Sequence, residues 1–286
     1  MGRWRRWIGI AAAMAAALVV LAGGAVFIGS EYVMGRGHPP FRERLAAPTA
    51  AQAADAPRQA RLLGCLSCHG EGLKGNVMVD IPNVAWIQAP NLTEVAARTG
   101  DQQLAAAIRQ GIGHDRRPLF VMPSAMYSRL SDGEVAALIG WIRSLPRVPG
   151  RIEGFRARPL GRVALVAGKL RPATAQMEEF RTAAPLDAGG GHAAGRRIAS
   201  VTCAECHGPA LSGRVMETGD VAPDLAIAGA YDFEQFKTLL RTGRPPSGRK
   251  LGLMAEVARQ DFVHLTEAEL RALHGYLAAR AAKLPD

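Results

Sequence analysis

The stretch Cys65-Leu66-Ser67-Cys68-His69 decides the fold, and it has a counterpart in Cys203-Ala204-Glu205-Cys206-His207. Two cysteines separated by two residues and followed at once by histidine form the attachment pattern of a c-type haem. The two sulfurs can reach the two vinyl groups of the porphyrin while the imidazole lies under the iron. We therefore predict two covalently bound haem c groups, with His69 and His207 as the proximal iron ligands. The attachment residues are Cys65, Cys68, Cys203 and Cys206.

A zinc site is the main alternative for these motifs, because cysteine and histidine are also zinc ligands. The two motifs use all four cysteines of the chain, so none remains for a disulfide or a third motif. The haem spacing would have to arise by coincidence twice in a zinc protein. The sequence therefore favours haem over zinc.

Length and charge narrow the class of protein further. The chain has 286 residues, enough for two domains of ordinary size, and a formal net charge of +10. A basic surface can indicate a nucleic-acid partner, but no run of lysine and arginine interleaved with aromatic residues is present. We therefore predict no nucleic-acid partner, and we interpret the charge as attraction to an acidic redox partner or to anionic lipid.

The N-terminal region predicts a single membrane-spanning helix. No charged residue lies between Arg6 and Glu31, and as a helix this run is about 36 Å long, more than the roughly 30 Å hydrocarbon core. Arg3, Arg5 and Arg6 precede it, which favours a cytoplasmic N-terminus and an exported remainder. We predict a single-pass anchor in the cytoplasmic (inner) membrane, with the haem domains in the periplasm. A cleaved signal peptide stays open, although the run is longer than a usual signal core and ends in no clean cleavage site.

The order of features after each histidine is repeated, which indicates a duplicated domain. Ala89-Pro90-Asn91-Leu92 in the first half matches Ala222-Pro223-Asp224-Leu225 in the second. A helical pattern ending in glycine, a methionine and a closing helix follow in both halves. The closing helices begin with capping boxes at Ser131 and Thr266.

Composition sets the predicted domain boundaries. The segment after the anchor is rich in alanine, proline and arginine and predicts a tether. The segment between the halves is rich in proline, glycine and arginine, and its one apolar run, Val163 to Leu170, is too short to cross a bilayer. We expect this linker to pack against one or both haem domains. The predicted division is an anchor (1–30), a tether (31–57), a first haem domain (58–148), a linker (149–190) and a second haem domain (191–286).

The sixth ligand of each iron decides between electron transfer and chemistry on a small molecule. Met122 and Met254 are the predicted axial ligands, because each lies after a glycine-containing loop and before the closing helix. A neutral thioether favours ferrous iron and raises the reduction potential. Met126 lies one helical turn from Met122 and remains the competing candidate.

These residues resemble the class I cytochrome c family, and more closely the membrane-anchored dihaem cytochromes c of bacteria. The resemblance covers roughly Arg58 to Val148 and Gly191 to Leu284. It implies an all-α fold of two tandem class I cytochrome c-like helical domains, preceded by the transmembrane helix. It also implies that the backbone carbonyls of Pro90 and Pro223 orient the ligating histidines. The second half departs from the family because no proline follows Met254.

The leading functional prediction is a one-electron carrier on the periplasmic face of the membrane. It would pass electrons between a dehydrogenase or quinol-oxidising complex and a terminal acceptor, with redox proteins as partners, no catalytic residues and no small-molecule substrate. Two alternatives stay open: a cytochrome subunit of a membrane-bound dehydrogenase complex, and a dihaem peroxidase or sulfur-compound oxidoreductase. The peroxidase or oxidoreductase would need a vacant or displaceable distal position on one iron, with acid/base groups beside it. The sequence shows no such cluster.

Overall fold

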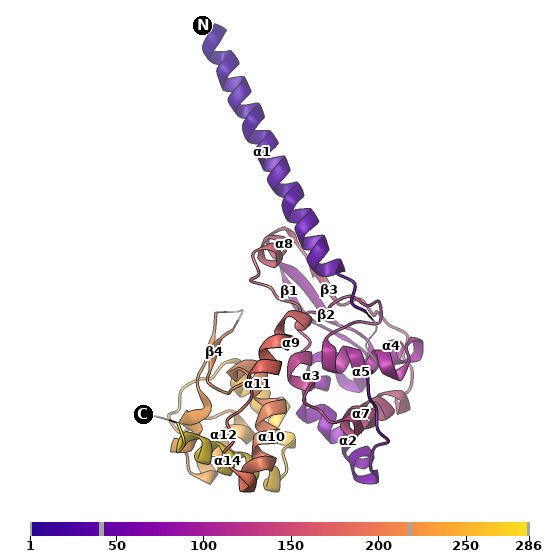
Figure 1. The fold of residues 1–286 in the computed structure, drawn as a ribbon, viewed down its shortest axis with the longest axis vertical. Helices are drawn as coiled ribbons and strands as arrows, with labels where there is room; N and C mark the ends of the chain where they lie inside the picture. The colour runs from indigo at the N-terminus through magenta and orange to yellow at the C-terminus, as the bar shows by residue number, and fades with distance from the viewer. Residues whose placement is uncertain (1, 40–42, 217–218, 285–286) are drawn as a thin grey trace.

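A computed structural model describes residues 2–39, 43–216 and 219–284 of the chain. It shows one long N-terminal helix that projects from a globular part built of many short helices (Figure 1). The first residue of the predicted anchor, residues 40–42 of the predicted tether, and residues 217–218 and 285–286 of the predicted second haem domain lie outside the described residues.

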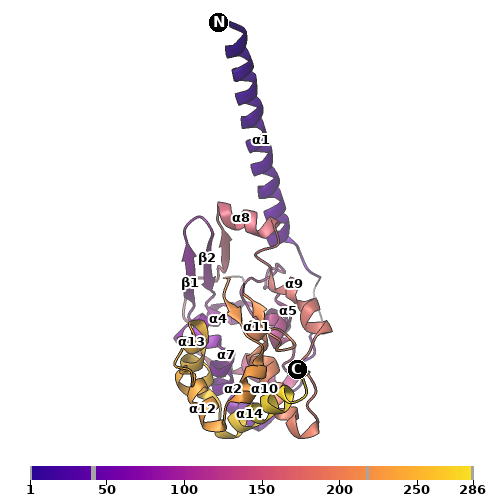
Figure 2. The ribbon, with the colours of Figure 1, turned by 90° about the vertical axis from the view of Figure 1, so that its left-hand side faces the viewer.

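Helix α1 (Gly2–Gly35) extends away from the rest of the molecule in both views (Figures 1 and 2). It is long and apolar enough to cross a membrane, and none of its most hydrophobic window is buried against the protein. The helix continues five residues past the predicted end of the anchor at residue 30. Its last turns therefore reach the globular part as ordered helix rather than as tether.

The first half of the globular part, residues 43–148, is a bundle in which α2 packs on α7. Thr49 and Gln52 form a capping box, so α2 already begins inside the segment predicted as tether. Pro57 lies inside this helix and does not end it, so the helix runs across the predicted boundary at residue 57. The helices are α2 (Ala50–Leu62), α3 (Cys65–His69), η1 (Glu71–Leu73), α4 (Leu92–Arg98), α5 (Asp101–Gln110), α6 (Ser124–Tyr127) and α7 (Asp132–Ser144).

The second half, residues 191–284, repeats this order of helices, with α10 packed on α14. Gly195 permits the close crossing, because a Cβ there would meet the backbone of Ala272 and the Cβ of Tyr276. Gly195 therefore admits the helix that carries Tyr276. The helices are η2 (Gly190–His192), α10 (Ala193–Thr202), α11 (Ala204–His207), η3 (Leu225–Ala230), α12 (Phe233–Thr242), α13 (Leu253–Gln260), η4 (Phe262–His264) and α14 (Glu267–Ala281).

Short β-strands are an addition to the predicted all-α fold. The longer hairpin alternates the β-branched residues Val77, Val79 and Ile81 along one strand, and its turn contains Asn83 with a φ of 63°. Alternation over so few residues is a weak signal beside the helical patterns. Antiparallel pairing joins β1 to β2 and β2 to β3 in one sheet, and β4 to β5 in another. The strands are β1 (Asn76–Ile81), β2 (Ala85–Ala89), β3 (Phe155–Ala157), β4 (Arg214–Val215) and β5 (Val221–Ala222).

The middle segment, residues 149–190, contains β3 and two helices, α8 (Pro159–Val166) and α9 (Ala173–Thr182). Helix α9 packs on α6 and buries Phe180. The guanidinium of Arg129 lies 5.1 Å from the centre of the Phe180 ring and donates to the Ala183 carbonyl at 2.7 Å. The predicted linker is thus a packed part of the globular structure.

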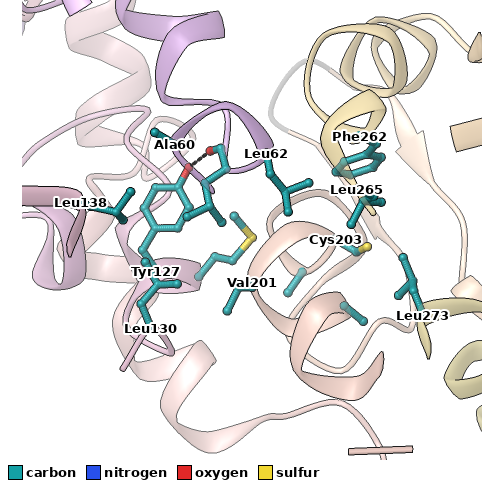
Figure 3. Packing of buried hydrophobic residues seen from close by; sticks show 14 of the residues in the cluster. Ala60, Leu62, Tyr127, Leu130, Leu138, Val201, Cys203, Phe262, Leu265 and Leu273 are labelled. Carbon is teal, nitrogen blue, oxygen red and sulfur yellow. Dashed lines mark hydrogen bonds between the residues drawn. The ribbon is translucent and has the colours of Figure 1, made fainter. Parts of the chain in front are cut away.

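Both halves contribute side chains to one hydrophobic cluster, which we call the shared core. Figure 3 shows Leu62 of the first half on the side that faces Leu265 and Phe262 of the second. Polar contacts cross the same junction: Arg58 donates to Glu269 at 2.8 Å, and Arg197 pairs with Glu134. Because apolar and charged groups both bridge them, the halves pack as a single body.

Candidate functional site

The first candidate site is built around His69 at the end of the short helix α3. The chain enters this helix through Gly64 and leaves it through Gly70, both at positive φ, where glycine has no Cβ to clash. His69 is 6% exposed, and its Nδ1 lies 2.8 Å from the Pro90 carbonyl oxygen. A carbonyl can only accept, so Nδ1 donates, and the lone pair is on Nε2, where a metal ligand needs it.

The Pro90 carbonyl is held in place by backbone contacts. Gly75 donates to the His69 carbonyl at 2.8 Å, and a Cβ on Gly75 would lie 2.9 Å from the Asn91 nitrogen. Asn91 is fully buried, caps helix α4 through its side chain and donates to the Val148 carbonyl at 2.7 Å. The orientation of the His69 ring therefore rests on a tight crossing of two backbone segments.

The second candidate site reproduces this geometry around His207. His207 is 7% exposed, and its Nδ1 lies 2.7 Å from the Pro223 carbonyl oxygen. Gly213 donates to the His207 carbonyl at 2.9 Å, and a Cβ on Gly213 would lie 2.8 Å from the Asp224 nitrogen. The register also agrees, because the residue after each glycine pairs with the alanine before each proline.

A buried leucine in a left-handed conformation strengthens the correspondence. Leu73 and Leu211 have φ values of 56° and 63°, and both are fully buried. A bulky residue other than glycine adopts this conformation only where the surrounding structure enforces it. Each leucine lies four residues after its histidine, so both sites use the same unusual turn.

Burial sets the protonation of both motifs. It lowers the pKa of His69 and of His207, which keeps the imidazoles neutral. It raises the pKa of Cys65 to about 12 and the pKa of Cys68 and Cys203 to about 11. No three His, Cys, Asp or Glu side chains gather into a metal-binding group among the described residues.

A cavity of about 520 Å³ opens beside the second motif. This volume lies within the roughly 300–1,000 Å³ of cofactor pockets. Cys203, Cys206 and His207 line it together with Met254, so the structure gathers the four predicted residues of the second half around one space. Most of the remaining wall is apolar, as a porphyrin face requires; it includes Leu225, Phe236, Leu239, Leu240, Leu251, Val257, Phe262, Leu273 and Leu277.

The two methionine candidates of the first half differ in their burial. Met122 is half-buried against the shared core, as is Met254, whereas Met126 is fully buried in that core. Val121, directly before Met122, has a φ of 67°, which is rare for a β-branched residue. Pro123 follows Met122, and its ring restricts the backbone on the C-terminal side of the methionine. Met122 is thus presented by a constrained loop, and Met126 packs as a core residue.

Comparison with known families agrees with this geometry. The cytochrome c family model matches residues 47–146.

Residues 47–146 form a cytochrome c domain. The domain carries Cys65, Cys68 and His69, and it implies covalently bound haem c and electron transfer. The match begins before the predicted boundary at Arg58 and includes all of helix α2, in agreement with the capping box at Thr49. A search of curated proteins found no match for the chain.

Three polar residues beside the first motif are not evident from the sequence. Tyr127 donates its buried hydroxyl to the carbonyl of Leu63, two residues before Cys65 (Figure 3). Ser67, inside the motif, donates to Asp261 of the second half. Burial raises the pKa of Asp261 to about 6. These partners are 64 and 194 residues apart in the chain, so no local pattern could have paired them.

Proposed function

We propose that the chain is a dihaem electron carrier anchored to the cytoplasmic membrane, with both haem groups on its periplasmic side. The main support for a second haem is the contact between His207 and the Pro223 carbonyl, which repeats the contact between His69 and the Pro90 carbonyl. The cavity beside Cys203 and Cys206 supports it. The matched left-handed turns at Leu73 and Leu211 have no role in a zinc site.

The residues that would hold each haem follow from the two sites. Cys65 and Cys68 would attach the first porphyrin and Cys203 and Cys206 the second, with His69 and His207 as proximal ligands. A bound haem c supplies reversible one-electron chemistry between ferrous and ferric iron. The proline carbonyls hold the proton on Nδ1 and thereby fix the ring orientation and the basicity of Nε2.

Met122 and Met254 are the proposed distal ligands. Their shared half-burial and the strained Val121 favour Met122 over Met126. Met254 lines the same cavity as His207, on the first turn of α13, which supports the pair in the second half. A thioether in this position raises the reduction potential and keeps water from the iron, as a carrier requires.

The junction between the halves supports transfer of electrons within the molecule. Ser67, between the two cysteines of the first motif, is hydrogen-bonded to Asp261, directly before Phe262. Phe262 lines the cavity of the second site. The first motif is therefore in contact with a segment that borders the second site. Such an arrangement suits a carrier that accepts an electron at one iron and delivers it from the other.

The location of the carrier is proposed from α1 and its flanking charges. The helix projects from the globular part with its most hydrophobic window unburied, and Arg3, Arg5 and Arg6 precede its apolar run. The bias of basic residues favours a cytoplasmic N-terminus, which leaves the globular part in the periplasm. The basic surface would attract acidic redox partners there.

The haem count tests this proposal. Mass spectrometry of the exported full-length protein should show two covalently added haems, and a pyridine haemochrome assay should give two haems per chain. The double variant Cys203→Ala/Cys206→Ala should lose one haem and keep the other. The matched variant Cys65→Ala/Cys68→Ala should do the same from the first site. A single haem in the natural protein that persists in the Cys203→Ala/Cys206→Ala variant would refute the dihaem proposal and leave the cytochrome c domain intact.

A further inference from the structure

Helix α8, in the middle segment, lies against the base of the long N-terminal helix. Arg162 of α8 forms an ion pair with Glu31 at 2.7 Å and donates to the Ser30 hydroxyl at 2.7 Å. Its guanidinium also lies 4.4 Å from the centre of the Phe27 ring. Val166 packs against Gly29, where an added Cβ would be 3.1 Å away. Helix α8 is therefore fixed to the last turns of α1.

The opposite flank of α8 rests on the turn between β1 and β2. A Cβ on Gly161 would meet the Val84 carbonyl, so helix and turn are in direct backbone contact. The backbone nitrogen of Leu160 donates to the Asn83 carbonyl at 2.8 Å, and Leu165 is buried. Figure 2 shows the strands reaching from the globular body to α8, which lies across their ends. The three-stranded sheet thus supports α8 at the edge of the body from which α1 projects.

The remaining face of α8 is apolar and exposed. Leu160 is 59% exposed, Val163 49% and Val166 48%. At about 100° per residue, these side chains form a stripe on the side of the helix away from Gly161 and Leu165. Since the buried side rests on the sheet, the stripe points away from the globular body, in the general direction that α1 takes.

The level of α8 along α1 corresponds to the edge of a bilayer. A hydrocarbon core of about 30 Å accommodates about 20 helical residues. Counted from Trp7, the first residue after the basic cluster, the core would end near Val26. Gly29, which contacts Val166, would then lie about 5 Å outside the core, in the headgroup layer.

The charge around α8 suits an anionic headgroup layer. Residues 151–171 contain six arginines and lysines and one glutamate, and four of the arginines form ion pairs: Arg156 with Glu153, Arg158 with Asp80, Arg162 with Glu31 and Arg171 with Glu179. Lys169 is exposed just beyond the C-terminal end of the helix. An apolar stripe flanked by basic residues is typical of helices that lie in the plane of a membrane surface. Ile81, at the end of β1, is 49% exposed and adds an apolar side chain beside the same turn.

We propose that α8 is a second membrane contact: its Leu160, Val163 and Val166 face lies in the interfacial layer of the bilayer that α1 spans. The inference rests on the proposed membrane anchor. One helix alone would let the globular part swing about its attachment. A second contact at α8 prevents this motion. Because α8 rests on the three-stranded sheet, whose first strand follows the first haem motif, the contact fixes which face of the carrier is turned toward membrane-bound redox partners.

Spin labels on the full-length holoprotein test this proposal in vesicles that contain anionic phosphatidylglycerol. Val163→Cys and Leu160→Cys each introduce a thiol on the apolar stripe, and the unsubstituted protein measures background labelling. Thr238→Cys is the matched control, because Thr238 is an exposed, β-branched residue on α12, which lies at the end of the body away from α1 (Figure 2). For each label, the collision rates with oxygen, which concentrates in lipid, and with a water-soluble nickel chelate are measured by power saturation.

We expect the oxygen-to-chelate ratio to be several times higher at positions 160 and 163 than at position 238. Equal, water-like ratios at all three positions in protein that stays with the vesicles would overturn the contact through α8 and leave the anchor standing. Release of the protein from the vesicles in a flotation gradient would overturn both the anchor and the inference. The haem count is independent of either result.

Discussion

The backbone crossing at Gly75 yields the sharpest prediction for the first haem site. Gly75 has a φ of 90°, and a Cβ on it would lie 2.9 Å from the Asn91 nitrogen, 3.1 Å from the Ala89 oxygen and 3.2 Å from the Pro90 carbonyl carbon. All three are backbone atoms, so no flexible side chain can move aside. Gly75→Ala therefore has to displace the segment whose carbonyl holds the His69 ring.

Two costs add in this variant. The left-handed backbone costs a residue with a Cβ about 1–3 kcal/mol, and the overpacking costs a further 1–3 kcal/mol or so. Gly219→Ala separates them, because Gly219 has a φ of 89° and none of the residues that the structure describes lies within 4 Å of an added Cβ. We expect Gly75→Ala to lower the free energy of unfolding by about 1–3 kcal/mol more than Gly219→Ala does.

Urea unfolding of the holoprotein in detergent measures this difference, followed by circular dichroism in the far ultraviolet and in the Soret band. A redox titration of the same samples should show a shifted potential for one haem in Gly75→Ala and unchanged potentials in Gly219→Ala, because only the first variant disturbs the Pro90 carbonyl. Equal losses of stability in the two variants would show that the crossing does not constrain the site, and the account of how His69 is oriented would fail.

Two more substitutions test the site. Met122→Ala should abolish the methionine-to-ferric-iron charge-transfer band of one haem. Met126→Ala should keep that band and lower the free energy of unfolding by about 2–5 kcal/mol, because it leaves a cavity in the core. Near-infrared spectra and urea unfolding measure the two effects, and the reverse pattern would make Met126 the ligand. The pKa of Asp261 is raised from 3.8 to about 6, so its contribution to stability is present in full below about pH 3.8 and is lost as the pH rises through about 6. Asp261→Asn should therefore lose less stability than the natural protein over this range in urea titrations at several pH values, and parallel pH profiles would contradict the raised pKa.

Local patterns in the sequence determined the chemistry of the first site. A haem attachment motif is five consecutive residues, so its meaning does not depend on distant parts of the chain. Capping boxes and amphipathic spacing are equally local, which is why the closing helices α7 and α14 begin at the predicted Ser131 and Thr266. The single apolar helix at the N-terminus follows from composition alone.

The hairpin and the middle segment show where local reading fails. Strands β1 and β2 are short, and β3, which extends their sheet, comes from residues 155–157. The strand propensity of so few residues is weak until the partner strand is in place. For the same reason the apolar run of α8 predicts only a packed linker, and the significance of its exposed stripe depends on its position beside the end of α1.

The sequence by itself determined which side chains carry the haem chemistry and which helix is apolar enough for a membrane, because these are properties of short continuous segments. Only the tertiary structure decided how the parts are joined. The Pro90 carbonyl meets His69, Asp261 meets Ser67, and α8 meets α1 through contacts between distant segments. Each of these contacts depends on how the whole chain between its partners is folded, and local hydrophobic patterns in the sequence do not specify that path.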